Sequence, residues 1–349
     1  MLSIEPALHH LVRRHQGIPV YCTQYARSII PRETDSTLNK RTHNQTFPIQ
    51  KMLRFITLAI VLLIASSAVF GRVRISGGSD AKPHQYPFYG GITASGLDKI
   101  ICSGFFYKED IFVSLANCQG IKYQVTDLLV YAGGNDRRCW DENVHCAVFQ
   151  VVKTITHPQY SAKTLSNDIG VYLLKENITT TIQKHPNDTV KVSTIGIPDT
   201  TPPLNETAHG YLMGWGRLNV SATAGPYNLQ SAEQAIIDDS YCNKADTAGK
   251  YQSDLMRCVN GTHGRGCMGD GGSALVIETE NGMQAAAMFS FSLGNTDNIC
   301  EEGTLHAYLN LVKYKKWIDQ TVETLNGSPS LLPATYLVLL IVSLMAFVL

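Results

Sequence analysis

The sequence has no excess of charge of either sign and little charge in total. It contains 29 lysines and arginines against 29 aspartates and glutamates, and charged residues make up 17% of its 349 residues. A chain without a basic surplus is not expected to bind nucleic acid as its main partner. Hydrophobic residues reach 44%, which predicts a globular chain and excludes a mainly disordered one.

Internal repeats, low-complexity blocks and long stretches of helical periodicity are also missing. Short alternating stretches between glycine-rich turns instead predict an all-β fold. Nine cysteines occur without a Cys-x-x-Cys pair, so a zinc ribbon or a thioredoxin-like site is not supported. His145 lies between Cys139 and Cys146, where a metal site is the alternative to a disulfide; outside the cell the disulfide is favoured. We expect no metal and no cofactor.

The N-terminal part has the features of a secretion signal. Residues 1–51 are polar and aperiodic, a poor basis for a folded unit, and are not expected in the mature protein. Residues 52–68 combine a basic start, an apolar core and small residues, as a signal peptide does; a retained signal anchor is the alternative. Cleavage there would leave a short stub, 69–74, and would remove Cys22, so that eight cysteines remain.

The C-terminal residues 326–349 resemble a signal for a glycosylphosphatidylinositol (GPI) anchor. Small residues from Asn326 to Ser328 precede an apolar tail that has no lysine or arginine after it. A single membrane-spanning helix is the alternative, but the lack of flanking basic residues favours the GPI anchor. Sequons between the two ends fit a glycosylated extracellular surface. They begin at Asn177, Asn187, Asn205, Asn219 and Asn260.

Several short motifs occur in a fixed order. They are Leu-Ala-Asn-Cys ending at Cys118, Asn-Asp-Ile around Asp168, Gly-Trp-Gly at 214–216, and Cys-Met-Gly-Asp-Gly-Gly at 267–272. Together these motifs resemble the trypsin-like, chymotrypsin-fold serine peptidases, over about Ile75–Val322. The resemblance implies two six-stranded antiparallel β-barrels with a C-terminal helix near 314–322, in one domain over 75–325.

The same resemblance implies a degenerate catalytic triad. Asn117 stands where the family has its catalytic histidine, Gly271 stands where it has its nucleophilic serine, and Asp168 matches the acid. Glycine has no oxygen to attack a carbonyl, and an amide does not titrate near neutrality. Asp168 alone has no imidazole to orient. We therefore expect no peptidase activity.

Other parts of the family's machinery are implied to remain. The backbone of Gly269 and Gly271 would form the oxyanion cradle, which can bind a carbonyl without cutting it. Arg74 and Ile75 resemble the activation junction, with Asp270 as the partner of the new ammonium group. Breaking such a buried pair from one side costs about 3–5 kcal/mol. The presence of both partners predicts that the activated conformation is reachable.

The specificity pocket is expected to be filled or blocked. Arg265 takes the position that is acidic in trypsin-like members, and His306 takes that of a glycine; the alternative for Arg265 is a solvated loop charge. The implied pocket residues are Arg265, Ser290, Phe291, Ser292 and His306. The resemblance also implies the disulfides Cys102–Cys118, Cys242–Cys258 and Cys267–Cys300, which with Cys139–Cys146 use all eight mature cysteines.

The sequence thus predicts a non-catalytic serine protease homologue, secreted or held on the outer cell face. It would act by binding an active protease, an inhibitor or a cascade substrate, as decoy, cofactor or regulator. Such homologues commonly serve extracellular cascades, defence or reproductive secretions. Two alternatives stay open: an active trypsin-like endopeptidase, and an adhesion or structural glycoprotein of the cell surface.

Overall fold

The computed structural model describes residues 78–326 apart from 96, 98, 120–122, 140, 142, 186–188, 201–208, 262–263, 295–299 and 302. The expected leader, the junction at Arg74 and Ile75, the anchor signal after Asn326, and the sequons at Asn187 and Asn205 lie outside the described residues. Within the part of the chain that is described, no helix is long and apolar enough to cross a membrane.

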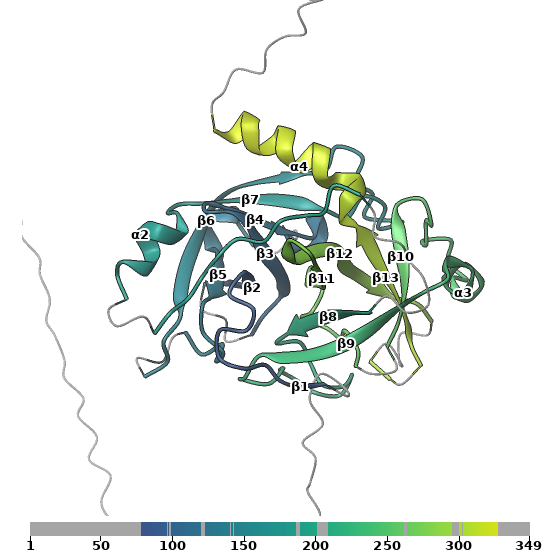
Figure 1. The fold of residues 1–349 in the computed structure, drawn as a ribbon, viewed down its shortest axis with the longest axis horizontal. Helices are drawn as coiled ribbons and strands as arrows, with labels where there is room; N and C mark the ends of the chain where they lie inside the picture. The colour runs from purple at the N-terminus through teal and green to yellow at the C-terminus, as the bar shows by residue number, and fades with distance from the viewer. Residues whose placement is uncertain are drawn as a thin grey trace, which may run out of the picture. The chain divides into compact units, whose positions relative to one another are not determined.

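The first half of the described chain forms a closed six-stranded antiparallel barrel in the order β2-β3-β4-β7-β6-β5 (Figure 1). Its strands are β2 (Tyr89–Ala94), β3 (Cys102–Lys108), β4 (Ile111–Ser114), β5 (Leu128–Ala132), β6 (Ala147–Thr156) and β7 (Gly170–Leu174). The two-residue period is clear in β6, where Phe149 and Val151 are buried and Val148 and Val152 are exposed. Phenylalanine rings fill the barrel: Phe106 lies 5.2 Å from Phe112 and 5.0 Å from Phe149 between centroids.

The second half forms another closed antiparallel barrel in the order β9-β10-β13-β12-β11-β8, with the short β1 (Ser79–Asp80) paired to β9. Its strands are β8 (His209–Gly214), β9 (Gln230–Ile237), β10 (Met256–Asn260), β11 (Ala274–Thr279), β12 (Gly282–Ser292) and β13 (Leu305–Asn310). The predicted fold, two six-stranded antiparallel barrels, is confirmed. Barrel closure leaves few free strand edges.

The helices are short except for the last. They are the 3₁₀ turns η1 (Ala116–Gln119) and η2 (Val125–Asp127), and the α-helices α2 (Ile178–Ile182), α3 (Asp239–Ala245) and α4 (Leu311–Leu325). Helix α4 contains the predicted stretch 314–322 and buries side chains spaced three and four residues apart, Leu311, Tyr314, Ile318 and Val322. It lies beside β7 (Figure 1), and its Tyr314 and Trp317 contact the ring of His157. His157 is therefore a packing residue.

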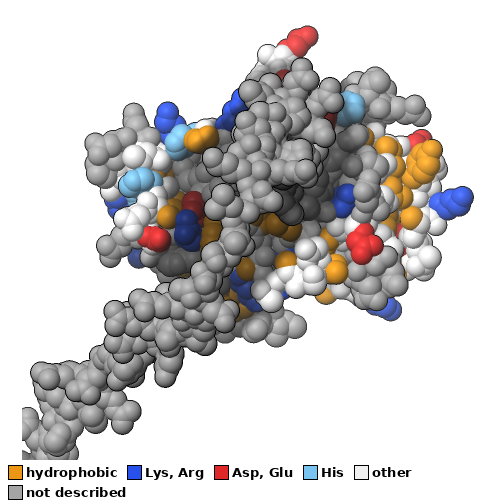
Figure 2. All heavy atoms as spheres, turned by 90° about the horizontal axis from the view of Figure 1, so that it is seen from below, with side chains coloured by type: hydrophobic (Ala, Val, Ile, Leu, Met, Phe, Trp, Pro, Cys, Tyr) orange, Lys and Arg blue, Asp and Glu red, His pale blue; other side chains and the backbone are white. Residues whose placement is uncertain are grey.

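Four disulfides join the expected pairs: Cys102–Cys118, Cys139–Cys146, Cys242–Cys258 and Cys267–Cys300. The first ties the start of β3 to η1, and the last ties the loop before β11 to the segment before β13. Of these segments, η1 carries Asn117, and the loop before β11 carries Gly269, Asp270 and Gly271. On the face shown in Figure 2, basic and acidic side chains are scattered singly among neutral ones, without a continuous patch of one sign.

Candidate functional site

Asn117 and Asp168 are brought together at one end of the first barrel. Asn117 lies on η1, directly after β4, and Asp168 lies just before β7, the strand that pairs with β4. The backbone N–H of Asn117 donates to Asp168 Oδ1 at 2.8 Å, and its side-chain Nδ2 donates to Asp168 Oδ2 at 2.7 Å. The amide of Asn117 thus makes the hydrogen bond that would orient an imidazole at this position.

Asp168 is fully buried, and this burial raises the pKa of its carboxyl to about 6. Hydrogen bonds from the backbone of Asn117 and Ala116 and from the side chain of Asn117 oppose that rise, and the nearby hydroxyl of Ser290 acts in the same direction. Ser290 belongs to β12, so the second barrel contributes to the environment of an acid carried by the first.

The loop from Cys267 to Ser273 carries Gly271, the third of the predicted triad positions. Gly269 and Gly272 have φ values of +102° and +92°, and a side chain on Gly272 would collide with the carbonyl of Ser103. The backbone therefore requires glycine at both places. Gly271 is different: its φ lies outside the left-handed region, and a Cβ atom there would meet only Leu115 Cδ1, at 3.2 Å. The fold does not demand a glycine at position 271.

This loop is anchored on β3 through Ser103. The N–H of Ser103 donates to the carbonyl of Gly271 at 2.7 Å, and its hydroxyl donates to the carbonyl of Gly269 at 2.9 Å. The Tyr89 hydroxyl lies 2.6 Å from the Ser103 hydroxyl. The N–H groups of Gly269 and Gly271 donate to no backbone carbonyl of a described residue. They are available to an oxygen acceptor brought by a ligand.

The Asp270 side chain points away from the loop surface. It is fully buried and accepts from the N–H of Gly216 at 2.7 Å and from that of Cys267 at 2.9 Å. Burial raises the pKa of this carboxyl to about 7. A Cβ on Gly214 or Gly216 would collide with the carboxylate, which explains both glycines of the Gly-Trp-Gly motif. Ser273 is also turned inward: its hydroxyl donates to the carbonyl of Met213.

Arg265 and His306 meet inside the second barrel. Arg265 is 9% exposed and its Nε donates to the carbonyl of Gly261 at 3.1 Å, so the alternative of a solvated loop charge is wrong. His306 is fully buried, with Nδ1 2.9 Å from Ser292 Oγ and its ring on Phe289. Burial, with the nearby charge of Arg265, lowers the pKa of His306 to about 3. The imidazole is therefore neutral at physiological pH.

The sequence motifs did not point to a groove of about 200 Å³ next to Gly269. Its lining comes from several separate loops, which is why no local pattern reveals it. The described lining residues are Lys99, Ile100, Ile101, Tyr123, Trp215, Arg217, Thr223, Ala224, Gly225, Met268 and Gly269.

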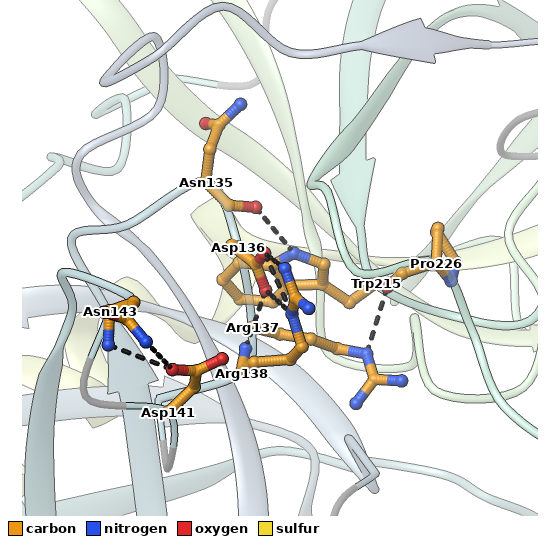
Figure 3. A network of polar contacts seen from close by, with 8 residues as sticks. All are labelled: Asn135, Asp136, Arg137, Arg138, Asp141, Asn143, Trp215 and Pro226. Atoms are coloured by element: carbon orange, nitrogen blue, oxygen red, sulfur yellow. Dashed lines mark hydrogen bonds and ion pairs between the residues drawn. The ribbon is translucent and has the colours of Figure 1, made fainter.

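The back wall of this groove is fastened to the first barrel (Figure 3). Arg137, 2% exposed, donates to the carbonyls of Pro226 and Gly225 at 3.0 and 3.1 Å. The indole N–H of Trp215 donates to the carbonyl of Asn135 at 3.1 Å. The described residues contain no group of three or more histidine, cysteine or acidic side chains that could hold a metal ion.

Known proteins resemble the chain across this whole region. A sequence model of the family described as Trypsin matches residues 75–318. The chain is 27% identical over 275 residues to "Granzyme-like protein 1" of Rattus norvegicus, covering 76% of this chain and 98% of that protein. It is 26% identical over 277 residues to "Granzyme B(G,H)" of Mus musculus, covering 78% and 100%. It is 24% identical over 253 residues to "Cathepsin G" of Mus musculus, covering 72% and 86%. The family match spans more than half of the chain and coincides with the two barrels and the cleft residues, so the chain belongs to the trypsin family.

Proposed function

We propose that this protein is a non-catalytic member of the trypsin family that works outside the cell by binding other proteins. One observation carries the proposal: the side chain that donates to Asp168 is an amide, that of Asn117, and the residue at the nucleophile's position is Gly271. These two positions therefore supply no imidazole to accept a proton and no side-chain oxygen to attack a carbonyl.

The loss of turnover expected from the two replacements is so large that binding is a better account of the protein than slow catalysis. In subtilisin, removal of either the serine or the histidine lowers turnover about two million-fold, roughly 8–9 kcal/mol of barrier. Here both groups are replaced. Ser273 is no substitute, because its hydroxyl is buried and donates to a backbone carbonyl.

The features that would bind a polypeptide are retained. The N–H groups of Gly269 and Gly271 have no described backbone acceptor, and the groove beside them is open. We propose an active protease, its inhibitor or a cascade substrate as the partner. The leader at 52–68, the sequons and the four disulfides support an extracellular location, with a GPI anchor at 326–349.

Peptide turnover and partner capture test the proposal together. The purified ectodomain, uncut or cut after Arg74, should leave a mixed peptide library intact. The variant Asn117→His with Gly271→Ser, prepared in the same way, is the positive control. Hydrolysis by the wild-type chain would establish the active endopeptidase instead.

Cross-linking on intact cells then identifies what the ectodomain binds. We expect an active protease, an inhibitor or a cascade protein among the cross-linked products. Recovery of matrix or cell-surface adhesion proteins alone would favour the adhesion glycoprotein. Phosphatidylinositol-specific phospholipase should release the protein from these cells; protein that stays on the membrane would contradict the GPI anchor.

A further inference from the structure

The groove beside Gly269 carries two cationic side chains and no acidic one among its described lining residues. Lys99 is exposed and Arg217 is half-buried. Neither forms an ion pair with a described residue. The guanidinium of Arg217 instead lies 3.8 Å from the sulfur of Met268. Two unpaired cations at the rim of one groove favour an anionic ligand.

The rest of the groove is largely apolar. Ile100, Ile101 and Tyr123 are partly exposed, and Met268 is 39% exposed. Isolated anions such as phosphate would gain nothing from these side chains. An apolar side chain placed among them would lose contact with water, which is worth about 25 cal/mol for each Å² buried.

The groove also contains a backbone hydrogen-bond donor. The N–H of Gly269 lines the same groove and donates to no described backbone carbonyl. A main-chain carbonyl of an extended polypeptide is the acceptor that fits a backbone N–H between an apolar surface and a charged rim. A polysulfated glycan lacks the apolar side chain, and two cations are few for a chain of repeated charges.

The groove is held in shape before any ligand arrives. The N–H of Arg217 donates to the carbonyl of Met268 at 2.8 Å, and Asp270 holds the neighbours of both, Gly216 and Cys267. Arg137 fixes the carbonyls of Gly225 and Pro226 behind them. A preformed groove loses less conformational entropy on binding.

We propose that this groove binds an extended segment of a partner protein that carries an acidic residue next to a large apolar residue. The carboxylate lies between Lys99 and Arg217, the apolar side chain packs on Ile100, Ile101 and Met268, and a main-chain carbonyl accepts from Gly269. The inference rests on the proposed function, because it identifies what the non-catalytic cleft holds.

Fluorescence anisotropy with labelled peptides tests this. The probes are acetylated octapeptides with a central Glu-Leu, Lys-Leu or Glu-Ser pair in a glycine-serine background. We expect the Glu-Leu peptide to bind at least tenfold more tightly than either of the others, with an affinity that falls as salt is raised. Arg217→Glu and Lys99→Glu should each weaken it about tenfold, and Met268→Ala severalfold. Lys153→Glu, on the exposed side of β6, is the matched charge-reversal control and should bind as the wild type does.

The inference is overturned by equal binding of the Glu-Leu and Lys-Leu peptides, by Arg217→Glu without effect in a variant of unchanged melting temperature, or by heparin binding more tightly than the peptide. Chromatography of the peptides after each titration separates the two proposals. A bound, intact peptide supports both. A cleaved Glu-Leu peptide refutes the non-catalytic function alone, and a peptide neither bound nor cleaved refutes the groove's ligand alone.

Discussion

The backbone conformation at Gly271 does not require a glycine. Its neighbours Gly269 and Gly272 need positive φ values, whereas position 271 lies outside the left-handed region, and a Cβ atom there would require only a small shift of Leu115 Cδ1, 3.2 Å away. Asn117 likewise keeps the hydrogen bond to Asp168 that an imidazole would make. In the proposed function, these two side chains alone account for the missing chemistry of the cleft.

The burial of Arg265 and His306 leads to a prediction about ligand binding in the specificity pocket. If Arg265 and His306 fill the family's specificity pocket, as the sequence predicts, benzamidine, a flat cation, should not bind the wild-type protein, since it would meet the positive charge of Arg265 and the buried ring of His306. The variant Arg265→Asp with His306→Gly should bind it at millimolar concentration or below, because a carboxylate then faces an open space. Calorimetry measures both. Binding of benzamidine by the wild-type protein would show that the pocket is open.

The two buried carboxyls predict how stability depends on pH. Burial raises the pKa of Asp168 from 3.8 to about 6 and that of Asp270 from 3.8 to about 7. The folded chain therefore binds these protons more tightly than the unfolded chain. Stability from this source is present below about pH 4 and is lost as the pH rises through 6 and 7, by a few kcal/mol in all.

Urea unfolding of the uncut chain between pH 4 and 8 checks this. The change Asp270→Asn should flatten the decline, while Asp199→Asn, at a side chain 91% exposed, should leave it as it is. An equal decline in the wild type and in Asp270→Asn would show that the Asp270 carboxyl stays ionised throughout this range.

At the scale of elements, strands and motif-bearing loops were predictable, and contacts between loops were not. Short alternating stretches predicted an all-β fold, and the ordered motifs predicted the two barrels and which residues stand at positions 117, 168 and 271. The link from Arg137 to Gly225 joins residues 88 apart in sequence and leaves no local pattern. The five-residue helix α2 is too short for a helical period to show.

Arg137 should hold the groove in place. Replacement by lysine keeps a charge but loses the planar group that reaches two carbonyls, and should lower the free energy of unfolding by about 1–3 kcal/mol. Binding of the Glu-Leu peptide should weaken in parallel. Arg138→Lys is the control, since Arg138 pairs with Asp136 at a more exposed site. Equal effects of the two changes would mean that the wall does not depend on Arg137.

The hydrogen bonds and the burial of the asparagines in the described sequons predict which of these sequons carry glycans. Asn177 caps α2 through its Oδ1 atom, and Asn219 accepts from Ser221 and Ala222 in an exposed turn, so the Nδ2 atom of each is free for a sugar. Asn260 lies in β10, between β9 and β13, with Oδ1 buried. Glycopeptide mass spectrometry should find glycans at Asn177 and Asn219 and none at Asn260. A fully occupied Asn260 would contradict the burial argument.

For the molecule as a whole, the barrels, the disulfides and the anchored loop from Cys267 to Ser273 hold the cleft in shape, although we expect no reaction in it. Retention of that scaffold is what a binding function requires, because affinity depends on a preformed surface. The leader and the anchor signal that the sequence predicts fit the same role.

Labelling with a fluorophosphonate probe tests this account most directly, since the probe reacts only with an activated serine. The ectodomain cut after Arg74 should remain unlabelled, as should the single variants Asn117→His and Gly271→Ser at short times. The double variant should be labelled within minutes if its folded cleft is restored. Labelling of the wild-type protein at a single serine in the cleft would contradict the account.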